Sequence, residues 1–152
     1  MGIVSVYSFY NVTQKPIVKE IEIEIEKLPQ RLSGFTIIQL SDLHLNFLKS
    51  TKWLDRIVGE TNNLKPDLVV IAGDLIDADP CEFTEFCEVL KRLNSKYGVF
   101  AITGNHEYYA GIDKFLRAAE KSNITVLRNE KITVADSIEL VGIDDNTGRR
   151  FS

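Results

Sequence analysis

The sequence has few of the residues that mark disulfide-rich, redox or nucleotide-binding proteins. It contains two cysteines, two histidines and four prolines among 152 residues. Cys81 and Cys87 form no C-x-x-C pair, so we expect buried thiols in a reducing compartment and no disulfide framework. The sequence also lacks a P-loop, a G-x-G-x-x-G fingerprint and a Ser-His-Asp order. Any catalytic chemistry must therefore come from other patterns.

Basic clusters and long apolar runs are also missing. Lys and Arg number 18 against 22 Asp and Glu, which gives a net charge of −4, and the basic residues are scattered. This pattern disfavours a nucleic-acid partner. Residues 1–10 lean apolar but supply only about half of the ~20 residues that a membrane-spanning helix needs. We interpret residues 1–16 as an N-terminal tail and the stump of a membrane segment, with a frayed soluble terminus as the alternative.

The apolar pattern along the rest of the chain predicts strands that alternate with helices. Residues 17–25 alternate apolar and charged residues, which predicts a half-exposed strand. Denser apolar runs at 35–40, 68–72 and 98–102 predict strands buried on both faces. Helices are predicted at 51–64 with Ser50 as cap, from Asp79 to Leu93, and at 112–119, and short strands near 124–127, 131–135 and 138–142. This order predicts an α/β domain with a mostly parallel sheet, and nothing marks a second domain.

Each of the three buried strands is followed by a polar cluster. The clusters are Asp-Leu-His at 42–44, Gly-Asp-Leu-Ile-Asp at 73–77 and Gly-Asn-His-Glu at 104–107. Because the carboxyl ends of parallel strands meet at one sheet edge, we expect the clusters to converge there. Both histidines of the chain lie in them, and the clusters recur at intervals of 32 (74 − 42) and 31 (105 − 74) residues. The combination is far more specific than any single cluster.

The residue types in these clusters suit a metal site. We expect Asp42 and His44 to share one face of an extended segment and to hold a cation with a carboxylate and an imidazole. Asp74 follows a glycine, and its two carboxylate oxygens allow it to bridge two cations. Asn105 offers a neutral amide oxygen to the second cation. A two-metal site of this kind is typical of hydrolysis at phosphorus.

The residues beside these ligands suggest supporting roles. His106 is left to act as an acid or to stabilise charge, and Glu107 is placed to orient it through the second ring nitrogen. Asp77 is the second acid of its cluster, and we expect it to lie outside the ligand set. Tyr108 and Tyr109 can line a substrate cleft or pack against the fold. Taken singly, most of these residues would be ordinary turn or cap residues.

The three clusters match the D-x-H, G-D-x-x-D and G-N-H-E/D blocks of the calcineurin-like metallophosphoesterase superfamily, which the chain resembles over about residues 17–148. The segments SDLHL, KPDLVVIAGDLID and YGVFAITGNHEYYAG look most similar to its bacterial membrane-associated branch, transmembrane proteins with a metallophosphoesterase domain. The resemblance implies a layered α/β/β/α sandwich. Residues 17–152 would form its N-terminal part, with a mostly parallel central sheet flanked by helices.

The resemblance also implies a metal-dependent phosphoesterase that hydrolyses phosphodiesters or phosphomonoesters with two Mn, Fe or Zn ions. By resemblance, the metal ligands are Asp42, His44, Asp74 and Asn105, the catalytic residue is His106, and Asp77 and Glu107 lie one layer further out. We expect the full-length protein to be membrane-associated with a soluble catalytic domain, and a cytoplasmic protein is the alternative. A lipid-linked phosphate ester would suit such an enzyme, and the oligomeric state stays open.

The sequence departs from the family pattern in two ways. Asn46 stands where the family often has glycine, and an asparagine tolerates a left-handed turn. No histidine follows His106, although the family supplies a later histidine and a G-H-x-H block. The chain is then either a fragment or a degenerate enzyme. The intact earlier clusters favour a fragment that is a weak enzyme alone. An inactive binding scaffold is the rival interpretation, and a receiver-type domain would have no use for the two histidine clusters.

Overall fold

The structure, a computed structural model, describes residues 17–46, 48–77 and 84–150. These residues fall into two compact units that divide between Phe35 and Thr36. The first unit contains a short 3-10 helix, η1 (Gln30–Leu32). The strand predicted at 17–25 is wrong, because this segment pairs with no other strand in the described residues. Its alternating isoleucines are solvent-exposed, since an amphipathic strand forms only where a partner covers its apolar face.

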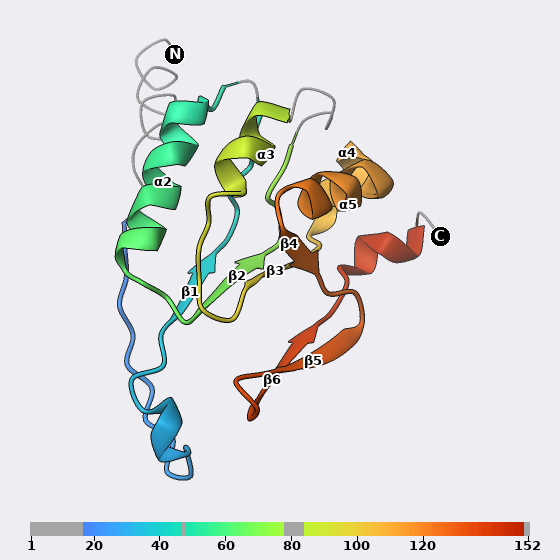
Figure 1. Cartoon of the computed structure of the whole chain (residues 1–152). Coiled ribbons are helices and arrows are strands. Elements are labelled where there is room, and N and C mark those ends of the chain that lie inside the picture. The colour runs from blue at the N-terminus through green and yellow to red at the C-terminus, as the bar shows by residue number, and fades with distance from the viewer. Residues whose placement is uncertain (1–16, 47, 78–83, 151–152) are drawn as a thin grey trace, which may run out of the picture. The chain divides into compact units, whose positions relative to one another are not determined.

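The second unit is built on a four-stranded parallel sheet in the order β1-β2-β3-β4 (Figure 1). Its strands are β1 (Ile37–Leu40), β2 (Leu68–Ala72), β3 (Val99–Ile102) and β4 (Ile124–Val126). Its helices are α2 (Thr51–Asn63), α3 (Thr84–Leu90), α4 (Asn105–Ala110), α5 (Ile112–Lys121) and the 3-10 helix η3 (Asn146–Arg150). An antiparallel hairpin of β5 (Glu130–Val134) and β6 (Ile138–Gly142) follows the sheet. The predicted α/β class with a parallel sheet is confirmed.

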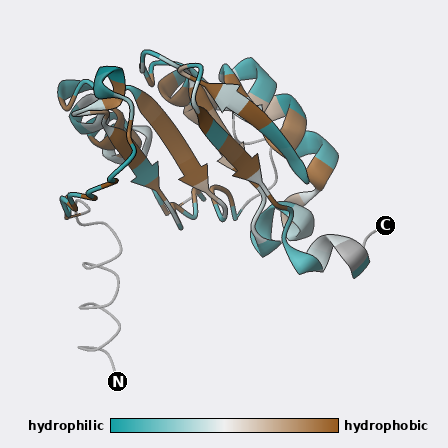
Figure 2. Ribbon diagram, turned by 90° about the horizontal axis from the view of Figure 1, so that it is seen from below, coloured by the Kyte–Doolittle hydropathy of each residue, from teal (hydrophilic) through white to brown (hydrophobic). Residues whose placement is uncertain are grey.

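One face of the sheet forms the hydrophobic core. Residues that share this face by register, such as Val69, Val99 and Ile124, pack in one cluster with buried residues of α2, α3 and α5. Figure 2 shows apolar residues concentrated on the strands, with the helices polar on their outer sides. The predicted cap of α2 is confirmed, because the Ser50 hydroxyl accepts a hydrogen bond from the Trp53 amide at 3.2 Å. The predicted cap at Asp79 lies outside the described residues.

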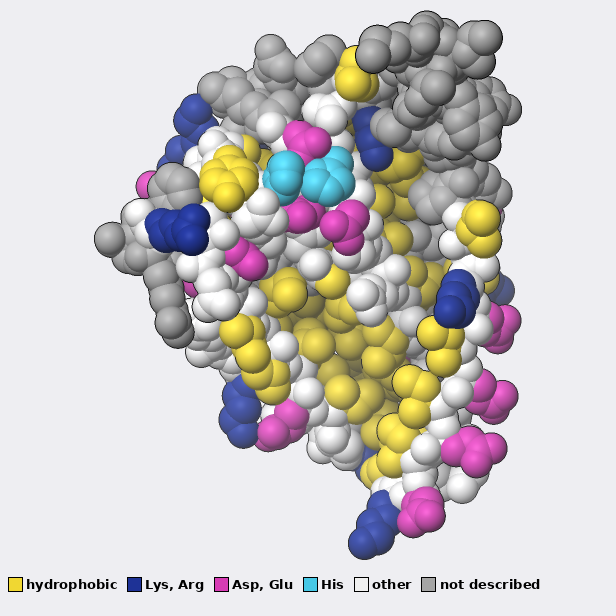
Figure 3. Space-filling view, turned by 180° about the vertical axis from the view of Figure 1, so that it is seen from behind, with side chains coloured by type: hydrophobic (Ala, Val, Ile, Leu, Met, Phe, Trp, Pro, Cys, Tyr) yellow, Lys and Arg dark blue, Asp and Glu magenta, His cyan; other side chains and the backbone are white. Residues whose placement is uncertain are grey.

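The opposite face of the sheet is apolar but only partly covered. Val70, Phe100 and Ile102 are half-buried there, and Ile37 is 50% exposed. Figure 3 shows hydrophobic side chains gathered on the surface next to the histidines and acids. The prediction that the runs at 35–40, 68–72 and 98–102 are buried on both faces is therefore wrong for this face, because the cluster that packs with the described helices lies on the other one.

Candidate metal centre

The loops that follow β1 and β2 run side by side beyond the ends of their strands. The His44 amide donates to the Asp74 carbonyl at 2.9 Å, and the Asp42 amide donates to the Gly73 carbonyl at 3.3 Å. Leu45 and Ile76 then form a parallel bridge, and both side chains are fully buried. Backbone pairing therefore holds the first two polar clusters together at the carboxyl edge of the sheet.

The backbone is left-handed at three residues of the first two clusters. Asp42, His44 and Asp74 have φ angles of 55°, 44° and 49°. The expectation that Asp42 and His44 alternate along an extended segment is wrong, although their side chains still meet. A non-glycine residue in a sparsely populated backbone region costs on the order of 1–3 kcal/mol, and such residues cluster at functional sites. Here the hydrogen bonds between the two loops help to offset that cost.

Two glycines let the second and third loops approach closely. A Cβ atom on Gly104 would lie 2.2 Å from the Asp74 Oδ1 atom. A Cβ on Gly73, where φ is 85°, would lie 2.8 Å from the Gly104 nitrogen. In this close contact the His106 amide donates to Asp74 Oδ1 at 3.1 Å. Asn105 follows Gly104 directly and is the first residue of α4.

Three residues present ligand atoms to one point. Asp42, His44 and Asp74 each offer one such atom, all within 4.8 Å of one another. The Asp42 side chain is 66% exposed and that of His44 is 31% exposed, so solvent reaches the group. The Ser41 hydroxyl donates to the outer Asp42 oxygen. Two carboxylates and an imidazole are a donor set that divalent and trivalent transition metals accept, so these residues fit the predicted metal.

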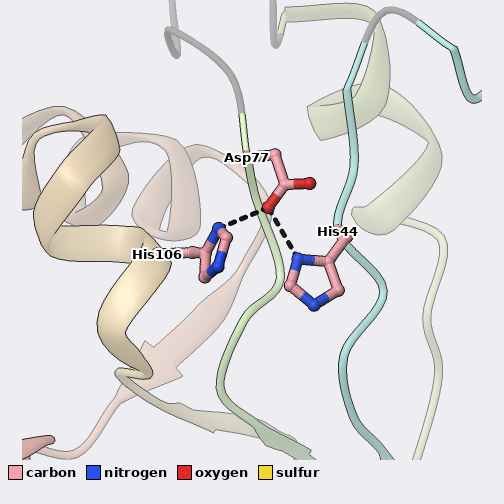
Figure 4. A group of neighbouring side chains, drawn as sticks. All are labelled: His44, Asp77 and His106. Carbon is pink, nitrogen blue, oxygen red and sulfur yellow. Dashed lines mark hydrogen bonds and ion pairs between the residues drawn. The ribbon is translucent and has the colours of Figure 1, made fainter.

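Asp77 connects the two histidines through a single oxygen atom. Its Oδ1 lies 2.6 Å from Nδ1 of His44 and 2.6 Å from Nδ1 of His106, while its other oxygen points away from both rings (Figure 4). Burial acts to raise the pKa of Asp77, but hydrogen bonds from His44 and Asn46 and the nearby imidazoles outweigh it and hold the pKa below its usual range. Because an ionised carboxylate only accepts hydrogen bonds, Nδ1 of His44 donates to it, and Nδ1 of His106 lies at ion-pair distance from the same oxygen.

The two imidazole rings also contact each other edge to face. Their centroids are 4.7 Å apart with an interplanar angle of 83°. Tyr109 stands beside them at 5.9 Å from the His106 ring and is 62% exposed. Tyr108 is buried instead, and its hydroxyl accepts a hydrogen bond from Arg128. Of the two tyrosines, Tyr108 therefore packs and Tyr109 borders the site.

Glu107 does not orient His106, contrary to the sequence interpretation. Its side chain has no solvent exposure, and its carboxylate accepts from the amides of 74, 75, 76 and 104 at 2.7–3.2 Å. The cause is α4, which begins at Asn105 and was not predicted. Glu107 is the third residue of this helix and reaches back to the Gly104 amide as in a capping box. The spacing of Gly104 and Glu107 is the sequence signal for that helix.

The geometry therefore collects the predicted residues in two layers. Asp42, His44, Asp74 and His106 meet at the carboxyl edge of the sheet, with Asp77 between the histidines. Glu107 lies beneath them among backbone amides. In the comparison with known proteins, the family model for calcineurin-like phosphoesterase matches residues 35–150. The chain belongs to the calcineurin-like phosphoesterase family.

Relatives of this phosphoesterase chain occur in animals and bacteria. It is 36% identical to a transmembrane protein with metallophosphoesterase domain from Danio rerio, over 97% of the chain and 36% of that protein. It is 35% identical to an uncharacterized metallophosphoesterase of Campylobacter jejuni, over 96% of the chain and 39% of that protein. A metallophosphoesterase of Aquifex aeolicus is 32% identical, over 88% of the chain and 51% of that protein. The phosphoesterase chain thus spans a third to a half of these relatives.

Two further findings concern solved structures and membrane-spanning helices. No solved structure matches the phosphoesterase chain at a significant level. Within the described residues, none of the helices has the length and apolar character to cross a lipid bilayer. Residues 1–16, which we interpret as a tail and membrane stump, lie outside the described residues.

Sequence reasoning missed a second carboxylate network, which adjoins the third cluster. Asp144 accepts a forked pair of hydrogen bonds from the Arg128 guanidinium and a third from the Thr103 hydroxyl at 3.0 Å. Burial acts to raise the pKa of Asp144, but the bonds from Arg128 and Thr103 outweigh it and lower the pKa. Thr103 directly precedes Gly104, so the network ties the end of β6 to the third cluster. No local motif in the sequence indicates this long-range pairing.

Proposed function

We propose that this chain carries the first part of a metal-dependent centre that hydrolyses phosphate esters. The observation that carries the proposal is the meeting of Asp42, His44 and Asp74, whose ligand atoms lie within 4.8 Å of one another. His106 stands next to this group, with its ring centroid 4.7 Å from that of His44. A metal-ligand set with an adjacent imidazole is the arrangement that metal-assisted hydrolysis requires.

The proposed metals are two ions of Mn, Fe or Zn. Asp42 and His44 would hold the first ion, Asp74 would bridge both, and Asn105 would bind the second. Mixed oxygen and nitrogen ligands accept each of these metals, so the donor set alone leaves the choice among them open. When bound, the ions would polarise the phosphoryl oxygens and supply a water nucleophile at neutral pH.

Asp77 would set the roles of the two histidines. Because Nδ1 of His44 donates to Asp77, its Nε2 carries the lone pair available to a metal, and this atom lies 3.8 Å from Asp42 Oδ1. Nδ1 of His106 lies 2.6 Å from the same oxygen, at ion-pair distance. Protonated His106 can then give its Nε2 proton to the departing oxygen of the ester, while Asp77 stabilises the imidazolium.

We also propose that the chain is the N-terminal part of a larger phosphoesterase domain. The half-exposed apolar residues Val70, Phe100 and Ile102 on the open sheet face support this, because soluble proteins seldom leave such a surface uncovered. The relatives from Danio rerio and Campylobacter jejuni are about two and a half times as long as this chain. In this chain the second ion would have little besides Asp74 and Asn105, so weak binding and slow turnover are expected.

A membrane attachment of the full-length protein is part of the same proposal. Relatives from Danio rerio and Bos taurus are named transmembrane proteins. A lipid-linked phosphate ester would suit an enzyme held at a bilayer. Fractionation of cells that express the native gene tests the attachment. Recovery of the full-length protein in the soluble fraction, at low salt and without detergent, would refute it.

The activity is tested by measuring metal content and hydrolysis together. The full-length protein should bind Mn, Fe or Zn and cleave bis-p-nitrophenyl phosphate or p-nitrophenyl phosphate, which separates diester from monoester preference. The 152-residue chain should do so much more slowly. A metal-loaded full-length protein without turnover on any phosphate ester would instead support the inactive scaffold.

A further inference from the structure

Asn46 was expected to adopt a left-handed backbone in place of glycine. In the structure it contributes through its side chain instead. Its backbone lies outside the left-handed region. Its Oδ1 accepts from the Leu48 amide at 2.9 Å, and its Nδ2 donates to Asp77 Oδ2 at 3.2 Å. The same amide group thus closes its own loop with one atom and reaches across to the loop after β2 with the other.

Asp77 is held on both of its oxygens as a result. Oδ1 accepts a hydrogen bond from Nδ1 of His44 and lies at ion-pair distance from Nδ1 of His106, both at 2.6 Å, and Oδ2 accepts from Asn46. The contacts on Oδ1 restrain the terminal torsion of the carboxylate through one oxygen only, and this torsion is broad for aspartate. The hydrogen bond from Asn46 to Oδ2 adds a restraint on the other oxygen. The direction of Asp77 Oδ1, and with it the orientation of both rings, then depends on Asn46.

We propose that Asn46 is a positioning residue that sets the orientation of His44 and His106 through Asp77. The loop that carries Asn46 is itself anchored. The Lys49 amide donates to the Asn46 carbonyl at 3.0 Å, and Lys49 Nζ donates to the Leu43 carbonyl at 2.8 Å. A glycine at position 46 could supply neither the amide donor nor the amide acceptor.

Two variants of the whole chain separate this role from a purely structural one. Asn46→Asp keeps an oxygen that can accept from the Leu48 amide but replaces the donor to Asp77 with a second acceptor. Asn46→Ala removes both. The matched control is Asn62→Ala, because the Asn62 amide also bridges two segments, donating to the Arg92 carbonyl and accepting from the Asn94 amide. That bridge involves no residue of the site.

The readout is the pair of imidazoles themselves. The chain has two histidines, so long-range proton–nitrogen NMR of the metal-free protein resolves His44 and His106 without further labelling schemes. In the wild type both rings should be Nδ1–H tautomers with slowly exchanging Nδ1 protons. In Asn46→Ala and Asn46→Asp these protons should exchange at least about tenfold faster, as expected when a supporting hydrogen bond is lost. The control should retain the wild-type signals.

The inference rests on the proposed function only for its second readout. Binding of Zn²⁺ alone, followed by calorimetry, should weaken about 3–10-fold in both Asn46 variants, less than the roughly 10–100-fold expected for a direct partner of a ligand. Wild-type imidazole signals in Asn46→Asp would overturn the inference, since the residue would then act only on its own loop. Failure of the wild type to bind Zn²⁺, with altered imidazoles in the variants, would count against the proposed function and not against this role.

Discussion

Two carboxylates of neighbouring clusters occupy opposite layers of the same site. Glu107, in the floor of the site, is fully buried and bonded to backbone amides of the second and third clusters. Asp77, at the rim, has a 26% exposed side chain and contacts two imidazoles and one side-chain amide. The comparison separates two uses of an acid at this site: one holds the loops in shape, and the other contacts the two imidazoles.

The difference follows from the partners that each carboxylate can reach. Backbone amides are neutral, fixed donors, and a carboxylate that accepts several of them needs no cation to be stable in the interior. Imidazoles carry a second nitrogen that remains available for a metal or a proton. Loss of the floor carboxylate should therefore damage the fold, whereas loss of the rim carboxylate should damage the chemistry. Four predictions test this division.

The largest effect is expected for Glu107→Ala. The change leaves the amides at positions 74, 75, 76 and 104 without their acceptor, and those of 75 and 76 are fully buried. The free energy of unfolding should fall by about 3–5 kcal/mol, since each unsatisfied buried donor costs on the order of 1–3 kcal/mol and partial relaxation recovers some of it. Denaturant unfolding measures this. Glu107→Gln keeps one carbonyl oxygen, so its free energy of unfolding should lie between those of the wild type and Glu107→Ala. A loss below about 1 kcal/mol for Glu107→Ala would show that Glu107 is not needed to hold the loops together.

The second prediction concerns the proposed metal ligands. In the full-length protein Asp74→Ala should lower metal content more than Asn105→Ala, because the proposed bridging carboxylate would serve both ions and carries charge. The affinity loss for Asp74→Ala should exceed the roughly 10–100-fold typical of outer partners. His106→Ala should reduce turnover and leave metal content nearly intact. Elemental analysis of the purified variants checks both. Equal metal loss in Asp74→Ala and His106→Ala would show that His106 is a ligand.

The third prediction is the counterpart of the first at the rim. Asp77→Asn replaces a shared acceptor with an amide that cannot accept equally from both imidazoles. Metal affinity should fall roughly 10–100-fold, while the free energy of unfolding should change by less than about 1 kcal/mol because the side chain is partly exposed. Calorimetry with Zn²⁺ and denaturant unfolding measure the two quantities. Asp136→Asn, an exposed acid in the turn between β5 and β6, controls for charge. A large loss of stability with unchanged affinity would reverse the comparison.

The smallest effect should come from Asp144, a third carboxylate that pairs with Arg128 beside the site. Its pKa is lowered in the folded protein, so its contribution is present above the unfolded pKa of about 3.9 and is lost as the pH falls through the lower folded value. Asp144→Asn should cost about 1 kcal/mol at neutral pH, since Arg128 is 38% exposed and partly screened by solvent. The difference in the free energy of unfolding between Asp144→Asn and the wild type should disappear as the pH is lowered. A difference that is the same at every pH would exclude the ionic origin.

Much of the sheet and of the ligand group followed from local patterns. The run Leu68–Ala72 was predicted with the bounds that the structure shows, because a dense β-branched run before a glycine has few other solutions. The meeting of Asp42, His44 and Asp74 followed from parallel strands that end at one edge. The strand predicted at 17–25 is wrong because an alternating pattern indicates an amphipathic segment but does not provide the neighbouring strand with which it must pair.

The sequence by itself determined which residues stand at the ends of the strands, since strand periodicity and cluster spacing are properties of the chain. The tertiary structure decided which acid serves which histidine. Helix α4 starts at Asn105, and successive residues on a helix diverge by about 100°, so Glu107 turns into the floor, away from the neighbouring ring of His106. Asp77 reaches both rings because the loops after β1 and β2 pair through their backbones. That pairing, and the left-handed backbone that accompanies it, depends on contacts between segments about thirty residues apart, which no local pattern encodes.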